Sequence, residues 1–92
     1  MIDSGAVYRV ASDVRFRIVA GEAVVVRQEA GEVMALNSTG ARILELVDGG
    51  RTVAAVVEAL EQELEVSREQ LTADVEVFLS ELLAIGALER CQ

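Results

Sequence analysis

Few residues in this chain could carry out covalent or acid–base chemistry. Cys91 is the only cysteine, and the sequence contains no histidine and no lysine. A thiol becomes a good nucleophile when a neighbouring base or cation favours the thiolate, and histidine is the usual base at neutral pH. Because no histidine accompanies it, we interpret Cys91 as a tail thiol. The sequence therefore predicts a protein that is not an enzyme, with no catalytic residue, no metal and no cofactor.

The carboxylates are numerous but scattered, and one of them stands out. Asp74 lies beside the main apolar stripe expected for the last helix, close to Phe78. Two interpretations stay open for Asp74: an ion pair with a nearby arginine, or contact with a ligand. The glycines, Gly40 among them, do not form a phosphate-binding pattern such as GxxxxGK, so we interpret them as turns and helix stops.

Length and charge restrict the class of protein. A chain of 92 residues is one domain, and its 52% hydrophobic content with three aromatic residues indicates thin layers built from Val, Leu, Ile and Ala. The net charge is −8, and residues 37–92 alone carry four arginines against eleven acidic residues. Nucleic acid binding depends on clustered basic residues. We therefore expect no nucleic acid partner.

The sequence carries no pattern for export or membrane insertion. The first five residues lack a basic region followed by a continuous apolar run, and no stretch approaches the roughly 18 apolar residues that span a bilayer. A single cysteine fits a reducing compartment. We expect a cytoplasmic protein with no membrane partner.

The first half of the chain predicts β-strands. Residues 1–12 form an N-terminal arm that is either disordered or a short strand. From Val14 to Ile18 apolar and arginine residues alternate, which is typical of a half-buried strand. Residues 23–27 form a second strand, whose continuous apolar run suggests contacts on both faces. Residues 33–36 form a third, and the short connections predict an antiparallel meander.

The second half predicts three helices. One of the residues Asn37–Thr39 should cap the first helix, of about ten residues, and residues 48–50 should end it. Thr52 and Ser67 should cap the second and third helices, and Gly86 should end the third. Together with the strands, this order predicts an α+β fold. The third strand runs directly into the first helix, so we expect it at an edge of the sheet with a helix beside it, forming a groove.

The third helix carries more apolar surface than one stripe requires. Ala73, Val77 and Ala84 cluster roughly opposite the main stripe. Either the helix is sandwiched between other elements, or part of this surface is left for a partner.

The pattern from Val14 to Glu89 resembles the PqqD-like proteins, also called RiPP recognition elements. These small domains bind the leader segment of ribosomally made precursor peptides. The resemblance rests on the order and spacing of three pieces of sequence. They are Gly31–Gly49 (GEVMALNSTGARILELVDG), Arg51–Val53 (RTV) and Asp74–Leu88 (DVEVFLSELLAIGAL).

The resemblance implies a winged-helix-like fold over residues 13–90, a three-stranded antiparallel sheet followed by three helices. The leader peptide would dock as an extra strand on the third strand, as an extended peptide can on an exposed sheet edge. Phe78 and Leu82 have an alternative interpretation as core residues. The implied peptide-binding residues are Val33, Met34, Ala35 and Leu36 on the strand, and Asp74, Phe78, Glu81 and Leu82 on the third helix.

The implied partners are a precursor peptide and a modifying enzyme, such as a radical SAM protein or a leader peptidase, in the biosynthesis of PQQ or of another modified peptide. Two other functions stay open. A winged-helix transcription regulator would share the order of elements, although it would need a basic face. A structural dimerisation module would use the surplus apolar surface or the open strand edge, and would make the chain a homodimer.

Overall fold

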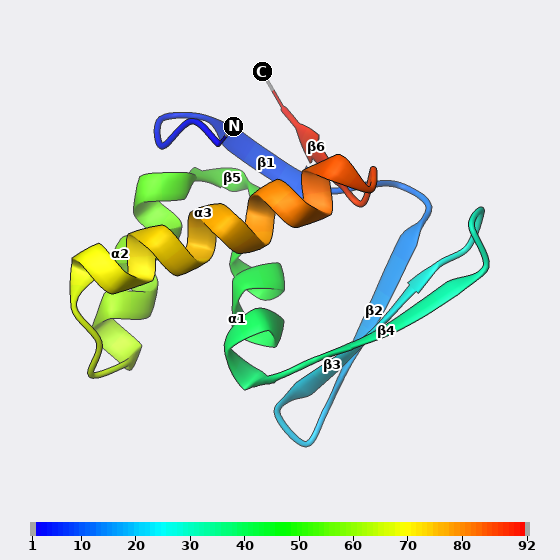
Figure 1. Cartoon of the computed structure of the whole chain (residues 1–92), viewed down its shortest axis with the longest axis horizontal. Helices are drawn as coiled ribbons and strands as arrows, with labels where there is room; N and C mark the ends of the chain where they lie inside the picture. Colours follow the sequence, from blue (N-terminus) through cyan, green and yellow to red (C-terminus); the bar gives the residue numbers. More distant parts are fainter. Residues whose placement is uncertain (1, 92) are drawn as a thin grey trace.

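The structure is a computed structural model that describes residues 2–91. In this range the chain is a mixed α+β fold of three helices and two three-stranded antiparallel sheets (Figure 1). No helix within residues 2–91 is long and apolar enough to cross a membrane. The helices are α1 (Ser38–Leu46), α2 (Val53–Glu63) and α3 (Arg68–Ala84). The strands are β1 (Val7–Val10), β2 (Val14–Val19), β3 (Glu22–Arg27), β4 (Glu32–Leu36), β5 (Asp48–Thr52) and β6 (Leu88–Arg90).

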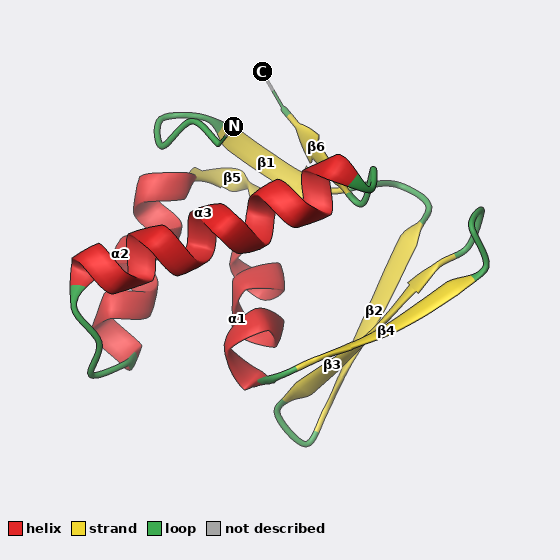
Figure 2. Ribbon diagram, viewed as in Figure 1, coloured by secondary structure: helices red, strands yellow, loops and turns green. Residues whose placement is uncertain are grey.

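The sheet β2–β3–β4 is the predicted antiparallel meander, with β3 in the centre and β4 at one edge. Val25 on β3 lies opposite Phe16 and Met34, and it is buried. Its neighbour Val24 points to the other face and is 40% exposed. The expectation that the second strand is covered on both faces is therefore wrong. The face carrying Val25 packs on the core. In Figure 2 the three helices all lie to one side of this sheet.

The sheet β5–β1–β6 was not predicted, so the expectation of one three-stranded sheet followed by three helices needs correction. Its central strand β1 shows that the N-terminal arm contains the short strand of the two alternatives. Residues 48–50, expected to end the first helix, belong to β5 instead. The helix ends earlier, where the Val47 N–H donates to the Ile43 carbonyl at 3.0 Å. Gly49 has a φ of +83° where the pairing register between β1 and β5 shifts, which explains a glycine at this point of a strand.

The predicted helix caps are present. Asn37, Thr52 and Ser67 each accept a hydrogen bond from a backbone N–H in the first turn of the helix they precede. At the end of α3, Gly86 has a φ of +79°, and the Gly86 and Ala87 N–H groups donate to the carbonyls of Leu83 and Leu82. This is the pairing of a glycine-terminated helix. The N-terminal donors are the N–H groups of Gly40, Ala55 and Gln70, at 2.9, 3.1 and 3.2 Å.

One core joins the helices to both sheets. Tyr8 from β1, Leu60 from α2 and Leu79 from α3 are each 2% exposed or less, and Val25 brings β3 into the same cluster. Along α3 the buried positions are Leu71, Val75, Leu79 and Leu82. Phe78 and Ile85 are only partly covered and lie toward β4.

Candidate functional site

The free edge of β4 is the feature around which the site is built. Within the described residues, β4 pairs only with β3, and the pairing runs without a break from Ala23 opposite Leu36 to Arg27 opposite Glu32. A regular edge strand leaves a row of backbone N–H and C=O groups on its outer side. β4 leads directly into α1, because the Asn37 side chain caps that helix one residue after the strand ends.

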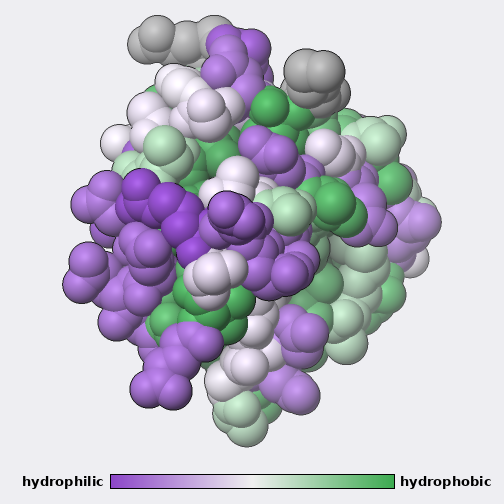
Figure 3. All heavy atoms as spheres, turned by 60° about the vertical axis from the view of Figure 1, so that its left-hand side comes forward, coloured by the Kyte–Doolittle hydropathy of each residue, from purple (hydrophilic) through white to green (hydrophobic). Residues whose placement is uncertain are grey.

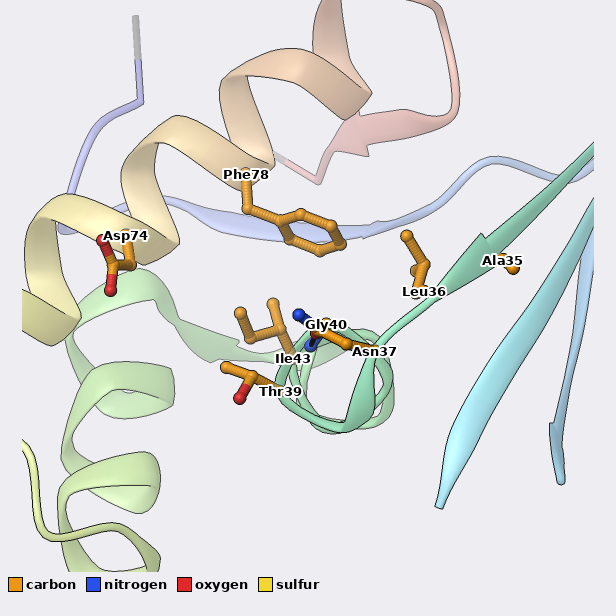
Figure 4. A pocket seen from close by; sticks show the side chains of 8 residues that line it. All are labelled: Ala35, Leu36, Asn37, Thr39, Gly40, Ile43, Asp74 and Phe78. Atoms are coloured by element: carbon orange, nitrogen blue, oxygen red, sulfur yellow. Dashed lines mark hydrogen bonds between the residues drawn. The ribbon is translucent and has the colours of Figure 1, made fainter. Parts of the chain in front are cut away.

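A first cavity of about 460 Å³ lies where β4 meets α1 and α3. Figure 4 shows the ring of Phe78 projecting from α3 over the start of α1, with Leu36 on the strand beyond the ring and Asp74 at the opposite end. The cavity is half polar in character because Asn37, Thr39 and Asp74 contribute to its wall. Its lining residues are Ala35, Leu36, Asn37, Thr39, Gly40, Ile43, Asp74 and Phe78.

A second cavity of about 430 Å³ lies further along the same strand and helix. Leu36 and Phe78 line both cavities, so the two form one continuous groove between β4 and α3. The wall of the second cavity is mostly apolar, with one carboxylate. Its lining residues are Met34, Leu36, Phe78, Glu81, Leu82 and Ile85.

Gly40 shapes the floor of the groove, and the sequence interpretation of this residue was wrong. It is buried inside α1 and makes no turn or helix stop. A side chain added there would place its Cβ 3.3 Å from Leu36 Cβ and 3.5 Å from Phe78 Cε1. A glycine within a helix costs about 1 kcal/mol relative to alanine. That cost is the signal that could have identified Gly40 as a close-packing position beneath Phe78.

Seven of the eight predicted site residues line the groove. Val33 is the exception: it is 68% exposed and lines neither cavity, and its side chain lies on the face of the sheet opposite Met34, a face that it shares with Ala35. Leu82 is buried in the core, as its alternative interpretation has it, and it also lines the second cavity. The seven are Met34, Ala35, Leu36, Asp74, Phe78, Glu81 and Leu82. Sequence reasoning did not assign to the site five further lining residues: Asn37, Thr39, Gly40, Ile43 and Ile85.

The charged side chains that line the groove are both carboxylates. Asp74 Oδ1 accepts a hydrogen bond from Gln70 Nε2 at 2.9 Å, and within the described residues no arginine pairs with Asp74. The ion-pair interpretation of Asp74 is therefore wrong. Glu81 is exposed at the apolar end of the groove. Both carboxylates favour a ligand that brings positive charge or hydrogen-bond donors to α3.

The clearest pKa effect in the molecule lies away from the groove, between α1 and α2. The Arg42 guanidinium donates to both oxygens of Glu63, with Nε to Oε1 at 2.8 Å and Nη2 to Oε2 at 2.7 Å. These hydrogen bonds hold the pKa of the Glu63 carboxylate below its ordinary value. Within residues 2–91 no group of three or more His, Cys, Asp or Glu side chains could hold a metal ion.

The open strand edge, the groove beside it and the mixed chemistry of its wall are features of domains that bind an extended peptide. A profile of the family described as Coenzyme PQQ synthesis protein D (PqqD) matches residues 22–88, which is more than half of the chain. The chain belongs to the PqqD family. No curated protein matches the sequence.

Three solved structures share the fold over most of their length. TbiB1 in complex with the TbiA(beta) leader peptide has a TM-score of 0.82 and 26% identity, covering 88% of this chain and 94% of that chain. Lasso peptide synthetase B1 complexed with the leader peptide has a TM-score of 0.81 and 25% identity, covering 91% and 99%. The PqqD truncation of Methylobacterium extorquens PqqCD, described as a functional and stand-alone RiPP recognition element, has a TM-score of 0.81 and 26% identity, covering 98% and 96%.

Proposed function

We propose that this chain is a non-catalytic module that captures the leader segment of a ribosomally synthesised precursor peptide and presents it to a modifying enzyme. The observation that carries the proposal is the continuous groove between the free edge of β4 and α3. Two of the similar solved structures are complexes with leader peptides, and the third is described as a recognition element for such peptides.

The leader peptide adds a strand to β4 in this proposal. The backbone hydrogen bonds to the peptide come from Val33, Met34, Ala35 and Leu36. They contribute affinity that does not depend on the sequence of the peptide. Alternate side chains of the peptide enter the groove. Apolar side chains contact Phe78 and Leu82, and polar or positively charged side chains contact Asp74 and Glu81. Side chains of this kind select among leaders because each cavity accepts only some shapes and charges.

The chemistry belongs to the partner enzyme, for which we propose a radical SAM protein or a leader peptidase acting in PQQ or related biosynthesis. We place the process in the cytoplasm, where precursor peptides are translated. We also propose that the fold is winged-helix-like. Support for this comes from the order of three helices with β5 between α1 and α2 and β6 after α3.

The test is an amide-resolved NMR titration of the labelled chain with synthetic leader peptides from precursor genes near its own gene. Saturable shifts are expected on residues 33–36 and 71–85. The matched control uses two N-methylated copies of the best leader, modified at the odd or at the even positions. Only alternate amides of an added strand donate to β4, so one copy should bind and the other should not.

Three outcomes would contradict the proposal. Shifts confined to β2, the other edge of the same sheet, would place the peptide on the wrong strand. Equal binding by both N-methylated copies would exclude strand addition. An absence of shifts with every leader tested would remove the peptide as the ligand.

A further inference from the structure

The β2–β3–β4 sheet has a second face, which points away from the core. Strand alternation places on this outer face Arg15 and Arg17 of β2, Val24 and Val26 of β3, and Val33 and Ala35 of β4. The opposite face carries Ala23 and Val25, which are 1% and 2% exposed. Strand alternation therefore leaves one face of the sheet in the core and the other uncovered.

The outer face combines exposed apolar side chains with a hollow. Val33 and Val24 are 68% and 40% exposed, and Val33 is the most exposed large apolar residue of the described chain. The hollow has a volume of about 360 Å³. Contiguous apolar surface with a polar rim marks interaction sites on soluble proteins. The residues lining the hollow are Arg15, Phe16, Arg17, Val24 and Val26.

The two arginines on this face are distinct from the others in the chain. Of the eight arginines, Arg15 and Arg17 alone form no ion pair within residues 2–91. Arg15 is held in place, because Nη1 donates to the carbonyls of Ser12 and Val14 at 2.7 and 3.1 Å. The chain has sixteen acidic residues, yet within the described part these two neighbouring guanidiniums pair with none of them. They are therefore available to bind a carboxylate of another protein.

The helical side of the molecule is strongly acidic. The helical part of the sequence, residues 37–92, holds eleven of the sixteen acidic residues. Figure 3, which turns the side carrying α2 toward the reader, shows hydrophilic residues covering most of that side. Positive charge and exposed valines thus occur together on the outer face, in contrast to the acidic helical side.

We infer that the outer face of β2–β3–β4 docks the modifying enzyme, through an enzyme surface that is apolar in the centre and carries carboxylates at its rim. This inference rests on the proposed function, because it assumes that a leader occupies the groove. A second copy of the chain is a poorer occupant. Packing the face on itself would bring four guanidiniums together against the two carboxylates of Glu22, the one acidic residue within strands β2, β3 and β4 that alternation places there.

The position of the face suits delivery of a peptide. A strand added to β4 would direct alternate side chains into the groove and the remaining ones onto the outer face, beside Val33. An enzyme docked on this face would therefore touch both the domain and the bound leader. Leader binding should raise the affinity for the enzyme, and the enzyme should raise the affinity for the leader by the same factor.

The test uses the peptide-modifying enzyme encoded nearest to the gene for this chain as the probe. Its affinity for the full chain is measured by biolayer interferometry with saturating leader, at several salt concentrations. The double variant Arg15→Gln and Arg17→Gln should weaken enzyme binding about tenfold and reduce its salt dependence. Val24→Asp should weaken it at least as much. The matched control Arg9→Gln and Arg51→Gln removes the same charge from exposed ion pairs elsewhere and should leave the affinity unchanged.

Leader affinity, measured on the same variants, separates this inference from the proposed function. If leader binding is intact and the enzyme binds all variants equally, or does not bind the wild-type chain, the outer face is not the docking surface. Light scattering shows whether the chain forms dimers. If the enzyme fails to bind only when the chain is dimeric, the face belongs to a second copy instead. Failure of the leader itself to bind the wild-type chain would refute the proposed function.

Discussion

The two sheets each have three antiparallel strands, but their edges differ. In β5–β1–β6, one edge strand has only three residues and the other carries Gly49 at a shift in register. In β2–β3–β4, the edge strand β4 pairs with β3 over five consecutive residues without irregularity. Short and irregular edges resist addition of a further strand, whereas a regular edge accepts one. One sheet therefore has short or irregular edges, and the other keeps a regular edge strand beside the groove.

Tyr8→Ala should give the largest effect on stability, because it empties the centre of β5–β1–β6. Tyr8 is 2% exposed, and loss of a buried aromatic side chain costs about 3–5 kcal/mol. Urea unfolding followed by circular dichroism measures the change. The control is Val33→Ala on the open sheet, where the cost should stay below about 0.5 kcal/mol. Similar losses in both variants would contradict the division between the sheets.

Phe78→Ala should give the largest effect on binding. Phe78 lines both cavities, so its removal opens the groove along its length. A central aromatic contact is worth about 2 kcal/mol or more, which corresponds to at least about a 30-fold loss of leader affinity by fluorescence anisotropy. Val77→Ala is the matched control, since Val77 is the neighbouring residue and is 61% exposed outside the groove lining. Equal affinity of the two variants would remove Phe78 from the site.

Asn37→Ala tests the junction between the open sheet and the helices. The Asn37 side chain accepts from the Gly40 N–H at 2.9 Å, and loss of such a cap costs about 1 kcal/mol. Thermal unfolding measures this loss. Ser38→Ala, one residue later and inside the helix, should change the midpoint much less. A larger fall of the unfolding midpoint in Ser38→Ala than in Asn37→Ala would contradict the assignment of Asn37 as the cap.

The smallest effect concerns pH and the Arg42–Glu63 pair on the helical side. Because the pKa of Glu63 is lowered in the folded state, its contribution to stability is present above the unfolded pKa of about 4.3 and is lost as pH falls through the folded value. Glu63→Gln should therefore be less stable than wild type at pH 7, and the difference should shrink toward pH 3. The pair is exposed, so the difference is small, and high salt should reduce it further. A difference independent of pH would exclude the pair as its cause.

Elements with a side-chain pattern were predictable from the sequence, and elements without one were not. The meander, the three helices and the caps at Asn37, Thr52 and Ser67 follow from alternation, helical spacing and capping residues. In β5, the sequence DGGRT has no buried residue and no apolar period. It is a strand because its backbone pairs with β1, for example Asp48 with Arg9, far earlier in the chain. Pairing of this kind leaves no local signal.

The same distinction applies to the groove. Residues on β4 and α3 were assigned because a strand edge and a helix stripe are visible in the sequence. Gly40 and Ile43 come from α1, and they reach the groove only because the core places α1 beneath Phe78. Val33 was assigned as one of four consecutive strand residues, although its side chain lies on the face opposite Met34. Position along the strand was the basis of these assignments, but the sheet register decides where each side chain points.

The antiparallel pairing of β1 with β6 sets how the domain can be joined to other proteins. Tyr8 lies opposite Arg90, so the two ends of the described chain leave side by side from the β5–β1–β6 sheet (Figure 1). The groove is formed by the other sheet and α3. A covalent fusion at either end, or insertion of the whole domain into a surface loop of an enzyme, would therefore leave the groove open. Neither arrangement would require the groove itself to change.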